Sequence, residues 1–327
     1  MSRPLHRDRV VVLAGGVGAA RLLRGLAPRM APGRMTVVVN TADDDVFHGL
    51  HVSPDVDTIL YTLSGLSDPN RGWGLDGDTF SALRALARYG EETWFQLGDR
   101  DLATHLFRTE RLRGGATLTE VTALQARALG VRVRVLPMCD QPVRTVIETT
   151  AGRRSFQEYL VRDRAREAVR SISYAGIRSS RPAAGVLAAI AEADAIVFAP
   201  SNPFVSLGPI LAVPGLRQAL RRAPAPVVAI SPLIGGRPVK GPADRMMRAH
   251  GLAPTPLALA DVYGDLLSGL VIDSSDRAFA PRLEARGLAS AHLDILMRSP
   301  LRAAAVGDAA LRLAASLRRG RRGRLAG

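Results

Sequence analysis

Short apolar runs alternate along the chain with segments of helical spacing. The apolar run Val10–Leu13 leads into the glycine-rich stretch Ala14–Gly18, and Ala19–Leu26 then has apolar residues at helical spacing. A second apolar run, Met35–Val39, ends in the polar cluster Asn40–Asp45. This order of short strands and amphipathic helices predicts a parallel sheet with helices on both of its faces.

The middle of the chain is more polar and favours helices. Three- and four-residue spacing of apolar positions predicts helices at Asp55–Leu63, Asp78–Arg88, Asp101–Arg111 and Thr119–Leu129. Strand patterns follow at Val131–Leu136, Thr145–Thr149 and Val169–Tyr174. We therefore expect a helix-rich insertion over about residues 65–169, with an antiparallel or edge-strand part.

Strands and helices then alternate again, at Val186–Glu192, Ala195–Ala199, Gly215–Arg221 and Val227–Ile230, and Ala303–Leu317 has the pattern of a long closing helix. The predicted fold class is α/β, with a Rossmann-like, three-layer, mostly parallel sheet and the insertion described above. We expect one α/β domain over residues 1–327, because no repeat or long linker divides the chain.

Composition is typical of a water-soluble globular protein. At 327 residues and 47% hydrophobic, the chain can bury a large core. It has no apolar run of the roughly 20 residues that a membrane helix requires, and Met1–Arg9 lacks the core of a signal peptide, so we expect a cytoplasmic protein. The single cysteine, Cys139, excludes an internal disulfide and a cysteine metal cluster.

The net charge of +14 does not favour nucleic-acid binding. Lys240 is the only lysine among 44 basic residues, which indicates a general bias toward arginine, and the arginines are spread over predicted helices as on solvated faces. The one cluster, Arg318–Arg324, predicts a basic flexible tail over 318–327. The excess positive charge suits an anionic small-molecule substrate.

The glycine-rich stretch after the first strand is a candidate phosphate loop. Gly15, Gly16 and Gly18 leave room for an anion near backbone N–H groups and the positive end of the next helix. The loop lacks the Gly-Lys-Ser/Thr of a P-loop, and Arg21 occupies the third glycine position of a dinucleotide fingerprint. A merely tight turn is the alternative.

Carboxylates gather after the second strand. Asp43, Asp44 and Asp45 come where ligands bind in open α/β sheets, and Asp55 and Asp57 follow at a predicted helix start. Clustered oxygen ligands without cysteine suit a hard cation such as Mg²⁺. An exposed acidic turn and a helix cap at Asp55 are the alternatives. Two nearby histidines are candidate zinc ligands, although structural or substrate-edge roles are favoured for His48 and His51.

Three further polar patches stand at predicted strand or helix ends. Arg100 lies in Leu97-Gly-Asp-Arg-Asp-Leu-Ala-Thr-His105, where a phosphate or an acidic ring edge is its expected partner. Ser201 and Asn202 follow the apolar strand near residue 198, and Lys240 lies in a glycine-rich segment after a later strand. Ser201 and Asn202 can donate to a phosphate, or Asn202 can contact a base or ribose, while Lys240 is of interest as the only lysine of the chain.

Taken in order, these patches resemble the 2-phospho-L-lactate transferase family of coenzyme F-420 biosynthesis. The matching segments are Ala14-Gly-Gly-Val-Gly-Ala-Ala-Arg21, Val39-Asn-Thr-Ala-Asp-Asp44, Gly49-Leu-His-Val-Ser-Pro-Asp-Val-Asp-Thr58, Leu97–His105, Pro200-Ser-Asn-Pro203, Ser231-Pro-Leu-Ile-Gly-Gly236 and Val239-Lys-Gly-Pro-Ala-Asp244. The resemblance implies transfer of a phosphoacid from a GDP-linked donor to the ribityl hydroxyl of the deazaflavin Fo, with release of GMP. It also implies a homodimer.

The resemblance assigns roles to the predicted residues. Mg²⁺ would be held by Asp43, Asp44 and Asp57, one of which would accept the hydroxyl proton. Asp55 and Arg100 would contact Fo, whereas Ser201, Asn202 and Lys240 would hold the GDP part, and Gly15, Gly16 and Gly18 would leave room for either ligand. The acid carried by the donor stays open among 2-phospholactate, phosphoenolpyruvate and 3-phosphoglycerate.

Two other functions are compatible with parts of this pattern. A related group of proteins with a similar glycine-rich start binds UDP-sugars and regulates without turnover, but the segments around Asp57 and Arg100 favour the transferase. A nicotinamide oxidoreductase is disfavoured by Arg21 at the third glycine position and by several aspartates, instead of one acid, after the second strand.

Overall fold

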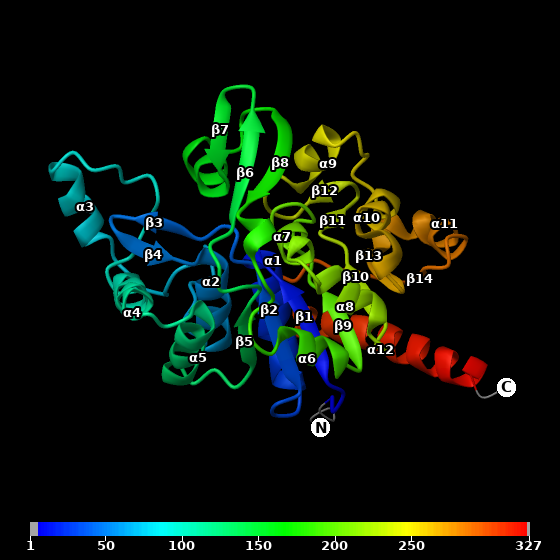
Figure 1. The fold of residues 1–327 in the computed structure, drawn as a ribbon. Helices are drawn as coiled ribbons and strands as arrows, with labels where there is room; N and C mark the ends of the chain where they lie inside the picture. The colour runs from blue at the N-terminus through cyan, green and yellow to red at the C-terminus, as the bar shows by residue number, and fades with distance from the viewer. Residues whose placement is uncertain (1–5, 326–327) are drawn as a thin grey trace.

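The computed structural model describes residues 6–325, and the side chains of residues 6–320. Seven strands of this part form one sheet whose neighbouring strands are all parallel (Figure 1). Their order across the sheet is β14 (Ala289–Leu293), β13 (Gly269–Asp273), β10 (Val227–Ile230), β9 (Ala195–Phe198), β1 (Val10–Ala14), β2 (Met35–Val39) and β5 (Arg134–Pro137). The predicted Rossmann-like parallel sheet is confirmed.

The strand order reverses beside β1. From β1 the chain moves to β2 and β5 on one side, then returns to β9 on the other side and continues to β10, β13 and β14. The loops that leave β1 and β9 therefore run in opposite directions from their carboxyl ends. Such a switch point opens a crevice where open α/β sheets bind ligands.

Helices cover both faces of the sheet, as a three-layer fold requires. One face is covered by α1 (Gly16–Leu26), α2 (Pro54–Leu63) and the closing helix α12 (Pro300–Leu325). The opposite face is covered by α6 (Val186–Ala191), α7 (Leu207–Ala212), α8 (Leu216–Arg222) and α10 (Pro256–Tyr263). Two separate hydrophobic clusters result, one on each side of the sheet.

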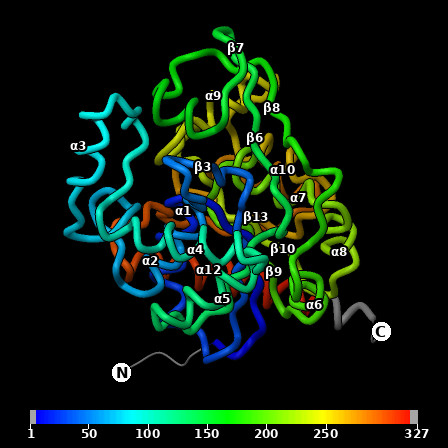
Figure 2. The backbone as a smooth tube through the Cα atoms, turned by 60° about the vertical axis from the view of Figure 1, so that its left-hand side comes forward, coloured from blue at the N-terminus to red at the C-terminus, as the bar shows by residue number. Residues whose placement is uncertain are grey.

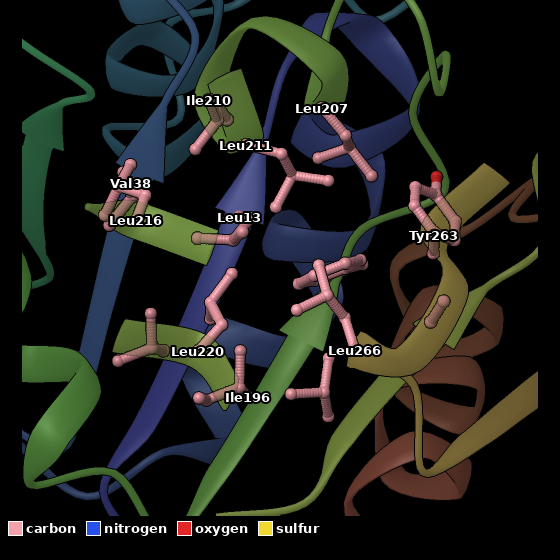
Figure 3. Packing of buried hydrophobic residues seen from close by; sticks show 14 of the residues in the cluster. Leu13, Val38, Ile196, Leu207, Ile210, Leu211, Leu216, Leu220, Tyr263 and Leu266 are labelled. Carbon is pink, nitrogen blue, oxygen red and sulfur yellow. The ribbon is translucent and has the colours of Figure 1, made fainter. Parts of the chain in front are cut away.

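Alternation along the strands divides the apolar side chains between these clusters. In β1, Val10 and Val12 pack toward α1 and α12, whereas Val11 and Leu13 pack on the other face. Figure 3 shows this second cluster, in which strand side chains such as Leu13 lie beneath residues of α7 and α8. Both faces of the central strands are buried, which explains why these strands are continuous apolar runs.

The first inserted segment lies between β2 and β5. Besides α2, it contains the hairpin of β3 (Asp45–Phe47) and β4 (Leu50–Val52) and the helices α3 (Ser81–Arg88), α4 (Asp101–Arg113) and α5 (Leu118–Ala128). The helix predicted from Asp78 begins only at Ser81. The reason is that Asp78 and Asp99 each cap the other helix. Asp99 accepts the N–H groups of Ser81 and Ala82 at the start of α3. Asp78 accepts the N–H groups of Arg100 and Asp101 at the start of α4.

The second inserted segment follows β5 and is antiparallel. Its strands β6 (Arg144–Thr149), β7 (Gly152–Ser155) and β8 (Val169–Ala175) form a small sheet that lies beside α9 (Ala243–Ala249) in both views (Figures 1 and 2). The range 65–169 expected as one helix-rich insertion therefore contains β5, an edge strand of the main sheet, with helices before it and antiparallel strands after it.

The remaining elements are short. They are the hairpin β11 (Leu233–Ile234) and β12 (Arg237–Pro238), helix α11 (Ala280–Glu284), and helical turns at Ala27–Arg29, Glu158–Arg162, Ile177–Ser179, Gly264–Leu266 and Ser274–Phe279. No helix in the described part of the chain is both long and apolar enough to cross a bilayer.

The basic tail predicted over 318–327 lies partly outside the described residues. Helix α12 continues to Leu325, and Arg318 forms ion pairs with Asp8 and Asp194 at 2.9 and 2.5 Å. The start of the predicted tail is therefore anchored to the domain, and its last two residues are not described.

Helices α1 and α12 approach each other closely at Gly25. A Cβ atom added there would overlap backbone atoms of Pro300 and Ala304, whereas at Gly320, further along α12, nothing lies within 4 Å. We expect Gly25→Ala to lower the free energy of unfolding by about 1–3 kcal/mol through overpacking. Gly320→Ala is the matched control and should stabilise the protein by up to about 1 kcal/mol through helix propensity. Urea unfolding followed by circular dichroism measures both changes, and an equal effect of the two substitutions would contradict this account of the packing.

Candidate functional site

A cavity of about 570 Å³ lies at the carboxyl ends of the central strands, at the switch point beside β1. Its wall combines the β1–α1 loop, the ends of β2, β9 and β10, and parts of both inserted segments. All but two of the predicted site residues line it, namely Gly15, Gly16, Gly18, Asp43, Asp55, Asp57, Ser201, Asn202 and Lys240. Asp44 and Arg100 are the two that do not.

The glycine loop packs tightly against its neighbours. Gly16 has a φ of +72°, and a Cβ atom at Gly18 would overlap the carbonyl oxygen of Pro200 at the end of β9. The hydroxyl of Ser201 donates to the Gly15 carbonyl at 2.7 Å, which holds the loop to the same strand end. Glycine is therefore required here for close approach to the protein itself, as well as for any ligand in the cavity.

Asp55 connects the glycine loop to the end of β2. Its carboxylate accepts the N–H of Gly16 at 2.8 Å and the side-chain amide of Asn40 at 2.9 Å. Burial raises the pKa of Asp55 to about 6, although these two hydrogen bonds act in the opposite direction. Both oxygens of this carboxylate are already engaged, so Asp55 shapes the loop that lines the cavity.

Asp43 and Asp44 are the under-compensated carboxylates of the site. The Oδ1 atoms of both are buried without a well-formed hydrogen bond, while Asp44 Oδ2 accepts the hydroxyl of Ser53 at 2.6 Å. Burial raises the pKa of both carboxyls well above its ordinary value, and the negative charge of Asp55 adds to the effect at Asp43. A bound cation would stabilise the charged form of both.

Asp45 is directed elsewhere, to an ion pair with Arg144 outside the cavity. The contacts therefore separate Asp43 and Asp44 from the third member of the acidic run.

Asp57 is paired with an arginine that the sequence did not single out. Arg108 of α4 is fully buried, and its two terminal nitrogens contact both carboxylate oxygens of Asp57, one of them at 3.0 Å. The same guanidinium donates to Gln125 of α5 at 3.2 Å. Among many arginines in this chain, no local pattern distinguishes Arg108, because its role depends on the contact between α4 and the start of α2.

This pairing changes the metal assignment. In the described part of the chain, no group of three His, Cys, Asp or Glu side chains is arranged to hold a metal ion. The predicted set of Asp43, Asp44 and Asp57 is therefore not assembled as one ligand cluster, because the oxygens of Asp57 face Arg108. The unpartnered oxygens of Asp43 and Asp44 do fit a hard cation.

A buried network from α2 and α4 continues this wall. The hydroxyl of Tyr61 donates to Asp101 at 2.5 Å, and His105 Nε2 lies 3.2 Å from the same carboxylate. All three side chains line the cavity. The candidate zinc histidines do not: His51 lies 3.9 Å from Asp44, and His48 lies 3.9 Å from Glu91. Their separate partners favour structural roles.

The remaining predicted residues differ in position. Asn202 Oδ1 accepts the N–H of Phe204 at 2.9 Å, which closes the turn after β9. Lys240 Nζ donates to the carbonyl of Arg71 at 3.0 Å at the edge of the cavity. Arg100 is exposed and donates to the carbonyl of Asp76 at 3.0 Å, so its predicted contact with Fo has no support in these side-chain positions.

One side of the cavity is aromatic. Trp94 and Phe95 of the first inserted segment line it, and Phe95 stacks on Phe47 of the β3–β4 hairpin with ring centroids 3.8 Å apart. Trp73 also lines the cavity, as do Leu160 and other apolar side chains of the second inserted segment. Trp73 and Trp94 therefore both belong to the wall. Their place in the wall allows contact with a flat, apolar ring system.

Comparison with known proteins shows which family the chain is similar to. The family model of 2-phospho-L-lactate transferase CofD matches residues 10–304. A phosphoenolpyruvate transferase of Kitasatospora aureofaciens is 45% identical, over 95% of this chain and 99% of that protein. A 2-phospho-L-lactate transferase of Methanosarcina mazei is 39% identical, over 89% of this chain and 95% of that protein.

A solved structure supports the fold alone. A Bacillus halodurans protein, titled a member of the UPF0052 family, superposes with a TM-score of 0.63 at 20% identity, covering 94% of this chain and all of that chain. The family model covers most of the chain, and the relatives match it nearly end to end. On this evidence the protein belongs to the CofD family of 2-phospho-L-lactate transferases, enzymes of coenzyme F-420 biosynthesis.

Proposed function

We propose that this transferase moves a phosphoacid from a GDP-linked donor to the terminal ribityl hydroxyl of the deazaflavin Fo and releases GMP. One observation carries the proposal: a single cavity joins a glycine loop, the under-compensated carboxylate of Asp43, which Asp44 follows in the chain, and an aromatic wall. The first two features suit a diphosphate with its cation, and the third suits a tricyclic ring. Membership of the family supports the same reaction class.

Phosphoenolpyruvate is the acid that we propose for the donor. Relatives named phosphoenolpyruvate transferase, from Kitasatospora, Streptomyces, Thermobifida and Mycolicibacterium, are 39–45% identical over 94–95% of the chain. The two Methanosarcina relatives named 2-phospho-L-lactate transferase are 39% identical over 89%. The match to the phosphoenolpyruvate transferases covers more of the chain, at equal or greater identity, and this supports phosphoenolpyruvate as the acid of the donor.

In the proposed reaction the acceptor hydroxyl oxygen bonds to the phosphorus that carries the acid. The bond from this phosphorus to the oxygen of GMP breaks, GMP leaves with that oxygen, and the hydroxyl proton passes to a carboxylate. Because Asp57 is paired with Arg108, we narrow the proton acceptor to Asp43 or Asp44. Positioning and charge neutralisation supply most of the catalysis in such transfers.

Asp43 and Asp44 would hold Mg²⁺, which would neutralise charge on the diphosphate when bound. Ser201, Asn202 and Lys240 would contact the guanosine diphosphate part, and Gly15, Gly16 and Gly18 allow the donor to approach the loop. A homodimer in the cytoplasm is part of the same proposal.

A product assay tests the proposed reaction. Incubating the protein with Fo, Mg²⁺ and each of three guanylylated acids should yield a phosphodiester detectable by mass spectrometry, together with GMP. We expect the phosphoenolpyruvate donor to give a kcat/KM about 10-fold or more above those of the 2-phospholactate and 3-phosphoglycerate donors, since their acids differ in shape around the same phosphate. If no donor yields a diester, the transferase proposal fails. A preference for another acid would contradict only the phosphoenolpyruvate assignment.

Substitutions in the acidic run test the metal assignment. Asp43→Asn and Asp44→Asn should each lower kcat/KM about 100-fold and weaken Mg²⁺ binding about 10-fold in calorimetry with GDP present. Asp45→Asn is the matched control, because Asp45 pairs with Arg144 away from the cavity, and should change either quantity less than about 2-fold.

Folding of these variants is checked by their melting temperatures. Asp43→Asn removes the charge repulsion between the side chains of residues 43 and 55, so the melting temperature of this variant should not fall below that of the wild-type protein. If Asp44→Asn left turnover and the dependence on Mg²⁺ unchanged, Asp44 would not be a ligand.

A further inference from the structure

Arg21 is a cation of the cavity wall with no acidic partner. It lies in α1, just after the glycine loop, and is half-buried. Among the described residues, the side chain of Arg21 takes part in no ion pair and no hydrogen bond, whereas the guanidinium of the fully buried Arg108 is bonded to Asp57 and Gln125. A half-buried guanidinium without a counter-charge is under-compensated, and it has five N–H groups available to a ligand.

Lys240 stands at the same corner of the cavity. Its ammonium donates to the carbonyl of Arg71, and Gly72, the next residue, packs against Val17 in the first turn of α1. These contacts bring the 239–243 loop, the 66–77 loop and the start of α1 together. Burial and the positive charge of Arg21 both lower the pKa of Lys240, which agrees with two nearby cations that share no acid.

In the described part of the chain, no acidic residue of the cavity forms an ion pair with Arg21 or Lys240. Asp55 is held at Gly16 N, and Asp43 and Asp57 follow β2 and open α2. Arg71 does not add a free charge, because its Nε donates to Asp68 at 2.8 Å. The cavity wall therefore contains two cations, Arg21 and Lys240, that have no acidic partner, although Asp55 already accepts the first N–H of α1 at Gly16.

We propose that Arg21 and Lys240 form a two-cation subsite for the diphosphate of the donor nucleotide. The identity of the anion rests on the proposed function, and the subsite itself rests on the cavity and its unpaired cations. Arginine suits this role because its planar fork binds two phosphate oxygens at once, and lysine adds a second point charge. A dinucleotide fingerprint has its third glycine at the position of Arg21. In this protein, the residue at that position would bind the ligand through its side chain.

Titration calorimetry with GDP, guanosine and inorganic pyrophosphate tests the subsite. Arg21→Gln should weaken GDP and pyrophosphate binding about 10-fold or more and leave guanosine binding within about 2-fold, because only the phosphates lose a charged partner. Arg24→Gln is the matched control: Arg24 is on the same helix, exposed and outside the cavity wall. It should leave all three affinities unchanged. Lys240→Gln should act in the same direction as Arg21→Gln, and Arg21→Lys should restore part of the GDP affinity.

The outcomes separate the subsite from the proposed function. If Arg21→Gln matches Arg24→Gln for GDP and pyrophosphate, or weakens guanosine as much as GDP, the subsite is wrong even when the wild-type protein turns over. If the wild-type protein binds pyrophosphate in an Arg21-dependent manner but neither GDP nor guanosine, the anion subsite stands and the guanosine donor of the proposed function fails.

Discussion

The buried carboxylate of Asp55 joins the parts of the molecule on which the site depends. It accepts one hydrogen bond from the glycine loop at Gly16 and one from Asn40 at the end of β2, and Asn40 also donates to the carbonyl of Val205 after β9. Three strand ends on both sides of the switch point are thereby held in one arrangement. A buried carboxylate is costly without such donors, so the Asp55 contacts are needed once its side chain is buried. The tight packing of Gly18 on Pro200 fixes the position of the same loop.

Charge in the cavity is distributed so that each part suits a different ligand group. Arg108 offsets the charge of Asp57 inside the protein, which leaves Asp43 and Asp44 as the carboxylates that lack compensation. Arg21 and Lys240, two cations of the same cavity wall, likewise have no acidic partner among the described residues. Removing one partner of a buried pair is far more costly than leaving the pair intact, so α4 and α5 are tied to the site through Arg108.

The inserted segments supply part of the wall of this site. A parallel sheet of the same architecture occurs in a Bacillus halodurans protein at 20% identity, and that likeness extends to the fold alone. Here the aromatic wall comes from the segment between β2 and β5, and the facing apolar side chains come from the one between β5 and β9. These parts of the cavity wall thus come from segments between the strands of the sheet and not from the strands themselves.

The sequence alone determined the parallel sheet, the loop that follows β1 and the acidic run after β2, because apolar periodicity and strand-end polarity are local patterns. It also carried the family motifs. Only the tertiary structure decided that Arg108 neutralises Asp57, that Arg100 turns to a carbonyl outside the cavity, and that Arg21 and Lys240 line the same cavity. Each of these depends on which side chains far apart in the chain become neighbours in the fold. The spacing of residues along the sequence does not give their distance in space.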